Sequence, residues 1–214
     1  MQGDTIVIED HHHRAAINIA AKLLPVIQAS TGKYTLTVAG ESGAGKSEVA
    51  TAIARQLEAA DIPCLILQQD DYFVYPPKTN DRTRREDIGW VGPQEVRLDL
   101  MSEHLKAFLD NEPSVEKPLV IYAEDRVDSE TLDMQGARVA IAEGTYTSKL
   151  EHVNTRVFID RDYRDTRKHR ERRNRDASEL DAFIDQVLII EHEIIAADKA
   201  RADVIINRDY TIDS

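Results

Sequence analysis

The sequence predicts an α/β fold, in which helices cover both faces of a mostly parallel, five-stranded sheet. Short apolar segments alternate with segments of helical periodicity along most of the chain, and a glycine-rich turn joins one apolar segment to the helix that follows it. Parallel strands need helical crossovers, so this alternation favours a parallel sheet. For a chain of 214 residues we expect one domain, spanning residues 1–214.

Residues 1–33 are expected to form an N-terminal extension ahead of that turn. A short strand is expected at residues 5–8 and an amphipathic helix at residues 12–28. The apolar residues of this helix that are expected to share one face are Ile17, Ala20, Ala21 and Leu24. The three histidines at positions 11–13 have no partners at the spacing of metal ligands, which disfavours a metal site. Both an added packing layer and an interface fit the extension.

The remaining elements follow from alternation and helical spacing. Residues 34–39 alternate and end at Gly40, and the helix at residues 49–60 ends at Asp61-Ile62-Pro63. Further strands are expected at residues 64–68, 119–122, 138–142, 157–160 and 204–206. Further helices are expected at residues 94–109, 163–176 and 180–200.

The glycine-rich turn fits the phosphate-binding pattern G-x-x-x-x-G-K-[ST] and predicts a P-loop NTPase fold. Its residues are Gly40, Glu41, Ser42, Gly43, Ala44, Gly45, Lys46 and Ser47. Glycines let successive N–H groups point at a phosphate, and the following helix adds the positive end of its dipole. Lys46 would reach the β- and γ-phosphates, and the Ser47 hydroxyl would bind Mg²⁺. We therefore expect ATP and Mg²⁺; a ligand-free glycine turn is the alternative.

A phosphate loop alone does not separate kinases from GTPases, motor ATPases or nucleotide-gated regulators. The guanine-specificity pattern Asn-Lys-x-Asp is absent, and the nearest fragment, Ser148-Lys149-Leu150-Glu151, differs from it at both ends. The decision therefore depends on residues elsewhere in the chain.

The second expected strand runs into Gln68-Gln69-Asp70-Asp71-Tyr72-Phe73. Ligands of such sheets collect at the carboxyl ends of the strands, so these side chains should face the γ-phosphate. Transfer to an alcohol needs a carboxylate that takes the hydroxyl proton, and Asp70 or Asp71 supplies one. The alternative for this pair is a solvated turn.

Together, these motifs resemble the uridine kinase and phosphoribulokinase group of P-loop kinases, over residues 34–208. The strand motif of that group reads Gln-Asp-Ser-Phe-Tyr, which implies that Asp70 is the catalytic base and a Mg²⁺ ligand. It also places the aromatic pair on Tyr72 and Phe73, with Asp71 in place of the serine. Ala142-Glu143-Gly144 is similar to the Glu-Gly pair of the group, and a carboxylate at Glu143 suits Mg²⁺.

The resemblance also implies an arginine-rich lid at residues 161–178. Residues 161–175 carry eight Arg or Lys against three acidic residues, although the whole chain has a net charge of −12. Arg167, Arg170 and Arg173 recur at a spacing that puts them on one helix face. Arg167 is expected to bind ATP, and Arg170 and Arg173 to stabilise the transferring phosphoryl group. A salt-bridged, solvent-facing helix is the alternative.

The chain departs from uridine kinases where that group binds its nucleoside. Gly89-Trp90-Val91-Gly92-Pro93 replaces an Asp-His-Pro motif, and Tyr122-Ala123-Glu124-Asp125-Arg126 replaces a His-Ser-Arg motif. Four basic residues crowd the segment after Phe73, which favours an anionic acceptor, while a solvated loop fits equally well: Lys78, Arg82, Arg84 and Arg85. We expect Asp71, Tyr72, Phe73, Arg84 and Tyr122 to contact the acceptor.

The sequence thus predicts an ATP-dependent kinase that phosphorylates a hydroxyl of a nucleoside, a sugar phosphate or another small metabolite. A nucleotide-binding regulatory protein and a P-loop hydrolase are the alternatives. The negative charge disfavours nucleic-acid binding, and no apolar run suits a membrane span or a signal peptide, so we expect a cytoplasmic protein. A homo-oligomer is compatible with the sequence.

Overall fold

The computed structural model describes residues 6–166 and 182–212, and its centre is a sheet of five parallel strands. The order of the strands across the sheet is β2-β5-β1-β6-β7, and every neighbouring pair is parallel. The strands are β1 (Tyr34–Gly40), β2 (Cys64–Gln68), β5 (Val139–Gly144), β6 (Thr155–Ile159) and β7 (Val204–Ile206). The expected α/β fold with a five-stranded parallel sheet is confirmed.

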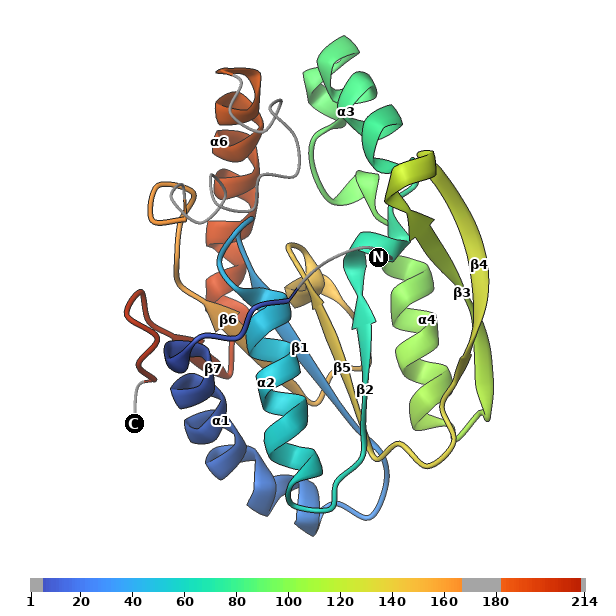
Figure 1. The fold of residues 1–214 in the computed structure, drawn as a ribbon, viewed down its shortest axis with the longest axis vertical. Helices are drawn as coiled ribbons and strands as arrows, with labels where there is room; N and C mark the ends of the chain where they lie inside the picture. Colours follow the sequence, from blue (N-terminus) through green and yellow to red (C-terminus); the bar gives the residue numbers. More distant parts are fainter. Residues whose placement is uncertain (1–5, 167–181, 213–214) are drawn as a thin grey trace.

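Helices cover both faces of this sheet (Figure 1). On one face, α1 (Asp10–Ala29) and α2 (Lys46–Glu58) pack over Leu36 and Val38 of β1. On the other face, α4 (Leu98–Leu109) and α6 (Ala182–Ala196) contribute to a second core around Ala140 and Phe158. Successive strand residues therefore alternate between two apolar cores, as the alternation of side chains along a strand requires.

A two-stranded antiparallel sheet stands apart from the main sheet. It consists of β3 (Ser114–Ile121) and β4 (Arg126–Asp133), hereafter the hairpin. The strand expected at residues 119–122 is confirmed as the end of β3, which belongs to the hairpin rather than to the parallel sheet, and β4 was not predicted. The segment after Phe73 was expected to be a loop, but it contains the helix α3 (Pro77–Glu86).

Short 3₁₀ helices connect these elements. They are η1 (Gln69–Tyr72), η2 (Ile88–Trp90), η3 (Pro93–Glu95), η4 (Tyr122–Glu124), η5 (Thr147–Lys149) and η7 (Ala197–Arg201). The expected helix at residues 163–176 is a turn at residues 163–166, and the remainder lies outside the described residues.

The N-terminal segment differs from its prediction in two ways. Residues 6–8 are irregular rather than a strand, whereas the expected helix is confirmed as α1. Its expected apolar face was wrong, because Ile17 is 52% exposed. The residues that are buried in α1 are His12, Ala15, Ala16, Ile19, Ala20, Leu23 and Ile27. This face carries the small alanines that let α1 approach α2 closely, and the larger Ile17 is left outside.

Three parallel strands end side by side at one edge of the sheet. Glu143 of β5 is in register with Val38 of β1 and with Gln68 of β2. The phosphate loop follows β1, η1 follows β2, and Gly144 ends β5. The parallel topology therefore gathers three segments that are distant in sequence at the position where α/β sheets bind ligands.

Candidate active site

The phosphate loop, residues 40–47, connects β1 to the first turn of α2. Its turn is closed by a hydrogen bond from the Ala44 N–H to the Glu41 carbonyl at 3.1 Å. Gly45 has φ +87°, in the left-handed region, immediately before α2 begins. The Lys46 ammonium donates to the Glu41 carbonyl at 3.0 Å. Backbone N–H groups, a helix N-terminus and a lysine therefore meet in one loop, which suits a chain of phosphates.

Ser47 and Glu143 meet beside this loop. The Ser47 hydroxyl donates to Glu143 Oε1 at 2.9 Å, and Glu143 is only 5% exposed. Burial, followed by the charge of Asp70, raises the pKa of Glu143 to about 7, while Lys46 and Ser47 act in the opposite direction. A buried carboxylate and a hydroxyl fit Mg²⁺, which takes few protein oxygens and completes its shell with phosphate and water. Among the described residues no cluster of three or more His, Cys, Asp or Glu could hold a metal.

Gln69 fixes the turn that carries Asp70, and its role was missed from the sequence. Gln69 is 1% exposed, and its side-chain oxygen accepts the Tyr146 N–H at 2.7 Å. A Cβ on Gly144 would lie 2.2 Å from the Gln69 Cβ, so only glycine fits after Glu143. The Gln69-Asp70 and Glu143-Gly144 segments therefore pack against each other. The presence of both motifs in one sequence was the signal from which this role of Gln69 could have been predicted.

The two neighbouring aspartates lie in different surroundings. Asp71 is 3% exposed, and its carboxylate accepts hydrogen bonds from Lys117 Nζ at 2.9 Å and from the Val120 N–H at 3.1 Å. Lys117 also pairs with Glu130 at 2.7 Å, so Asp71 anchors the hairpin. Asp70 is half-buried, and no hydrogen bond or ion pair joins its carboxylate to any other described residue. Asp70 thus keeps a carboxylate available for chemistry.

Asp70 lines a cavity of about 170 Å³, hereafter the Asp70 cavity. Its walls are Asp70, Phe73, Pro77, Asn80, Asp81, Arg84 and Tyr122. The expected residues Phe73, Arg84 and Tyr122 therefore gather around Asp70. Tyr72 does not, because it is 0% exposed and its hydroxyl bonds His104 Nδ1 at 2.8 Å. Tyr72 belongs to the core, since the 3₁₀ turn of η1 directs it away from Asp70.

Arg84 reaches the wall of this cavity, but its charge is already paired. Its Nε donates to Glu95 Oε2 at 2.9 Å, and its Nη2 donates to Glu191 Oε1 at 3.1 Å. Glu95 is 0% exposed, and burial raises the pKa of Glu191. Two buried carboxylates therefore offset one guanidinium, and the expected free cation for an anionic acceptor is not found at Arg84.

The segments that replace the uridine kinase motifs hold α3 in place. The Trp90 indole N–H donates to Asn80 Oδ1 at 2.9 Å, and Asn80 Nδ2 donates to Glu95 at 2.8 Å. Asp125, in the turn of the hairpin, accepts the Lys78 N–H at 2.7 Å at the start of α3. These departures from the resemblance therefore shape the Asp70 cavity.

Helix α6 touches both sides of the site through two adjacent residues. Glu191 binds Arg84 of α3, and His192 Nδ1 lies 2.6 Å from Glu41 Oε1 of the phosphate loop. Neither residue belongs to a recognisable sequence motif. The lid residues Arg167, Arg170 and Arg173 lie outside the described residues, so their expected roles stay predictions.

Comparison with known proteins decides the family. The model of the Phosphoribulokinase / Uridine kinase family matches residues 35–213. The chain belongs to this family. As a member of it, the protein is a small-molecule kinase that uses ATP, rather than a regulatory P-loop protein or a hydrolase. Helix α1 lies outside the matched residues.

Curated kinases of two kinds are similar in sequence. The uridine kinase of Lactiplantibacillus plantarum is 30% identical over 186 residues, which cover 79% of this chain and 84% of that protein. The bifunctional alpha-galactosidase/sucrose kinase AgaSK of Mediterraneibacter gnavus is 29% identical over 192 residues. That match covers 84% of this chain but only 20% of the longer protein.

Solved structures share the fold of this family member. A possible uridine kinase from Bacillus stearothermophilus has a TM-score of 0.65 at 15% identity, and the match covers 90% of this chain and 97% of that one. The D-glycerate 3-kinase of Cryptococcus neoformans has a TM-score of 0.59 at 12% identity, with 96% and 98% covered. At these identities the likeness shows the fold alone.

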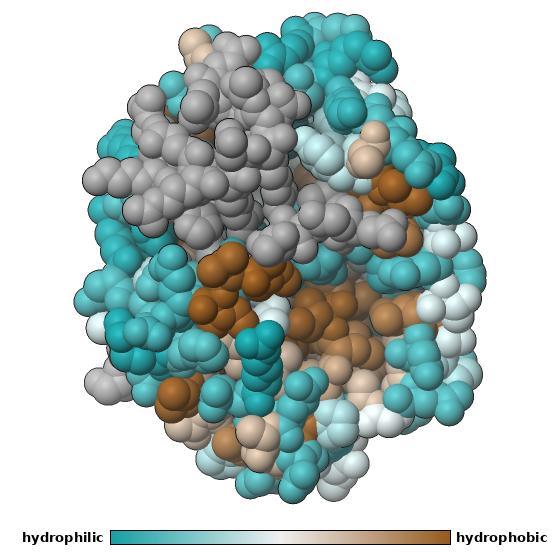
Figure 2. All heavy atoms as spheres, viewed as in Figure 1, coloured by the Kyte–Doolittle hydropathy of each residue, from teal (hydrophilic) through white to brown (hydrophobic). Residues whose placement is uncertain are grey.

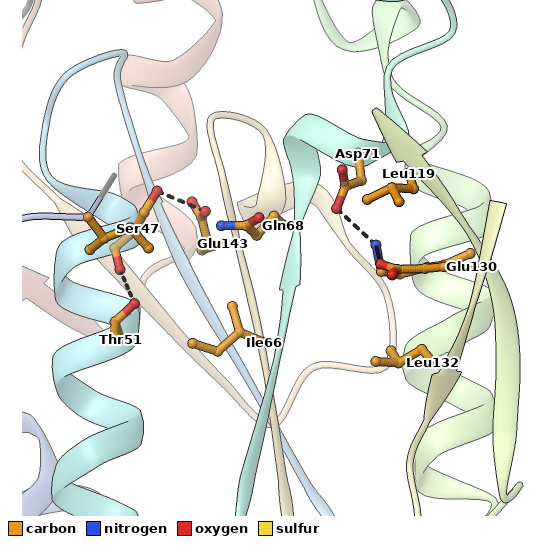
Figure 3. Close-up of a pocket in the computed structure, with 11 residues that line it drawn as sticks. Ser47, Thr51, Ile66, Gln68, Asp71, Leu119, Glu130, Leu132 and Glu143 are labelled. Atoms are coloured by element: carbon orange, nitrogen blue, oxygen red, sulfur yellow. Dashed lines mark hydrogen bonds and ion pairs between the residues drawn. The ribbon is translucent and has the colours of Figure 1, made fainter. Parts of the chain in front are cut away.

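The kinase has a second, larger cavity of about 400 Å³ between α2, β2 and the hairpin, hereafter the Ser47 cavity. Figure 3 shows the Ser47–Glu143 pair at one end and the Asp71 and Glu130 side chains at the other. Ile66, Leu119 and Leu132 form an apolar floor, and Figure 2 shows an apolar hollow beside α2.

Within the described residues, no helix has the length and apolar composition needed to cross a membrane.

Proposed function

We propose that this kinase transfers the γ-phosphoryl group of ATP to a hydroxyl of an uncharged carbohydrate. The observation that carries the proposal is the position of Asp70. Its carboxylate is unpaired among the described residues and lines a cavity of about 170 Å³, and Asp70 lies two residues after Gln68, which is in register with Glu143 on the neighbouring strand. Phosphorylation of an alcohol needs a base, here Asp70, close to the carboxylate beside the phosphate loop, here Glu143. It also needs space for a small acceptor molecule.

In the proposed reaction, the phosphate-loop N–H groups and Lys46 hold the triphosphate. The acceptor hydroxyl lies in the Asp70 cavity, and its proton passes to Asp70 as the new oxygen–phosphorus bond forms. The bond between the γ-phosphorus and the β–γ bridging oxygen breaks, and ADP leaves. Mg²⁺, held by Ser47 with Glu143 and Asp70, would neutralise charge on the phosphates when bound. Arg170 and Arg173 are proposed to act on the same phosphates from the lid, with Arg167 on ATP.

The choice of an uncharged acceptor rests on the local charges. Arg84 is offset by Glu95 and Glu191, Asp81 of the cavity wall pairs with Arg85 at 2.8 Å, and Asp70 has no cation partner among the described residues. A phosphate or carboxylate on the acceptor would meet net negative charge there, which is unfavourable in a half-buried site. The names of two relatives, a uridine kinase and a sucrose kinase, also point to uncharged acceptors. The altered nucleoside motifs favour a carbohydrate over a nucleoside.

We place the reaction in the cytoplasm because it consumes ATP.

The test incubates the protein with Mg·ATP and separate pools of sugars, nucleosides, sugar phosphates and hydroxy acids, with mass spectrometry for any compound that gains one phosphate. The expected product comes from the uncharged sugars. A product from sugar phosphates or hydroxy acids alone would contradict the charge argument, and ATP hydrolysis with no phosphorylated acceptor would contradict kinase activity on these classes.

A further inference from the structure

The outer side of the phosphate loop is covered by residues from both ends of the chain. Tyr210, in the segment after β7, donates its hydroxyl hydrogen to the Ala44 carbonyl at 2.9 Å and accepts from Arg161 Nη1 at 2.8 Å. A Cβ on Gly45 would lie 2.7 Å from the Tyr210 hydroxyl and 2.8 Å from His12 Nε2. His12 and Tyr210 therefore pack directly against the two residues that precede Lys46.

His11 and His12 of α1 form a closed ring of contacts with Glu9, made of two hydrogen bonds and one ion-pair contact. The Glu9 backbone N–H donates to His12 Nδ1 at 3.1 Å, so a neutral His12 carries its hydrogen on Nε2. His12 Nε2 lies 3.1 Å from His11 Nε2, which must then accept, and His11 Nδ1–H faces Glu9 Oε2 at 3.4 Å. The ring of His11 also lies 4.2 Å from the ring of Tyr210, measured between centroids. Both imidazoles are neutral in this arrangement, and each fixes the other.

We propose that His12 and Tyr210 are positioning residues for the phosphate loop, which hold Ala44 and Gly45 in the conformation that binds ATP. Gly45 has φ +87°, a conformation that glycine adopts but does not hold by itself. A loop that is ordered before the ligand arrives loses less conformational entropy on binding, and the ligand binds more tightly. The residues that match the family model begin at position 35, so His12 lies outside that match.

The ring also makes the support sensitive to acid. Glu9 and Asp10 favour a charged His11, whereas burial first, and then Arg161 and Arg14, hold the pKa of His11 below its ordinary value of 6.5. Among the described residues, the rings of His12 and Tyr210 also face His11, at centroid distances of 4.0 Å and 4.2 Å. If His11 and His12 were both protonated, two positively charged imidazolium rings would lie 3.1 Å apart at their Nε2 atoms and would repel each other. Because the folded pKa is lowered, the neutral ring contributes stability above pH 6.5 and loses it as the pH falls below that value.

The test measures the Kd for ATP by calorimetry without any acceptor, so its outcome is independent of the proposed carbohydrate substrate. His12→Asn keeps an acceptor for the Glu9 N–H but is too short to reach Gly45, and Tyr210→Phe removes only the hydroxyl. His13→Asn is the matched control, because His13 takes no part in the ring formed by the described residues. Melting temperatures show whether each variant is folded.

We expect Tyr210→Phe and His12→Asn to raise the Kd for ATP about 3- to 10-fold, the range that one lost hydrogen bond gives, with His13→Asn within about twofold of the parent. In the parent, the Kd should rise as the pH falls from about 7.5 to about 5.5, and His12→Asn should flatten this profile. The inference is overturned if folded His12→Asn and Tyr210→Phe bind ATP with the Kd of the parent. It is also overturned if the Kd of His12→Asn changes with pH as the Kd of the parent does. A loss of ATP affinity accompanied by a melting temperature well below that of His13→Asn would also overturn it, because it indicates a general structural defect.

Discussion

In the proposed nucleotide half of the active site, the groups expected to bind phosphate are backbone N–H groups and Lys46, whereas the proposed acceptor half consists of side chains that pair with one another. Residues 40–47 form one local turn. Around the Asp70 cavity, Arg84 depends on Glu95 and Glu191, which are 11 and 107 residues away in sequence. We therefore expect the backbone half to be common to a family of kinases and the paired half to set what one member accepts.

The largest change that this comparison predicts is in the nucleotide half. Lys46→Ala should lower kcat about 10²- to 10³-fold, because it removes a fixed positive charge from the phosphates. The thermal midpoint should change little, since Lys46 is not part of the buried core. A product assay measures kcat, and scanning calorimetry measures the thermal midpoint. Arg55→Ala, at an exposed position of the same helix, is the control and should match the parent.

The acceptor half should lose stability when a pair is broken. Arg84→Met leaves Glu95 and Glu191 without their shared cation and should lower the free energy of unfolding by about 3–5 kcal/mol. Chemical denaturation measures this loss. Burial already raises the pKa of Glu191, so this carboxyl takes up a proton and loses its charge as the pH falls. The difference in the free energy of unfolding between Arg84→Met and the parent should therefore become smaller in acid.

The neighbouring residue offers a matched control for Arg84. Arg85 pairs with Asp81 at 2.8 Å, but both side chains are more than a third exposed. Arg85→Met should therefore cost about 1 kcal/mol or less. A loss as large as that of Arg84→Met would show that the buried pairing does not distinguish the two arginines.

A smaller loss is expected at Asp71. Asp71→Asn weakens the anchor of the hairpin, but Glu130 still pairs with Lys117, so the loss of stability should be about 1–3 kcal/mol. The KM for the acceptor should rise more than the Kd for ATP, because the hairpin adjoins the acceptor half. An unchanged KM for the acceptor, with weaker ATP binding, would reverse the roles assigned to the two halves.

The same contrast explains what could be predicted from the sequence. The phosphate loop was predicted because its requirement, a glycine turn between a strand and a helix, is local. Asp70 and Glu143 were assigned from the resemblance to the family, and their roles stay predictions. Strand β4 was missed because six of its eight residues are exposed, and its pairing with β3 rather than its own hydrophobicity makes it a strand. Helix α3 was missed because its only buried residue is Asn80.

The pairing of Arg84 could not be predicted for a related reason. A run of basic residues favours an anionic ligand only if no carboxylate reaches them first, and Glu191 arrives from a helix near the other end of the chain. The support of the loop by His12 and Tyr210 likewise joins residues from both ends. Such contacts depend on the completed fold rather than on any local pattern.

The most direct test of the account measures ATP binding and phosphoryl transfer in one preparation of Asp70→Asn, beside the parent and Asp71→Asn. Because the phosphate-loop N–H groups and Lys46 are proposed to supply most of the ATP binding, the Kd for ATP should stay within about twofold, while the rate of transfer to the acceptor falls about 10²- to 10⁴-fold. Asp71→Asn should keep most of the transfer rate. Transfer by Asp70→Asn within about tenfold of the parent, or loss of ATP binding together with transfer, would contradict the assignment of Asp70 as the base.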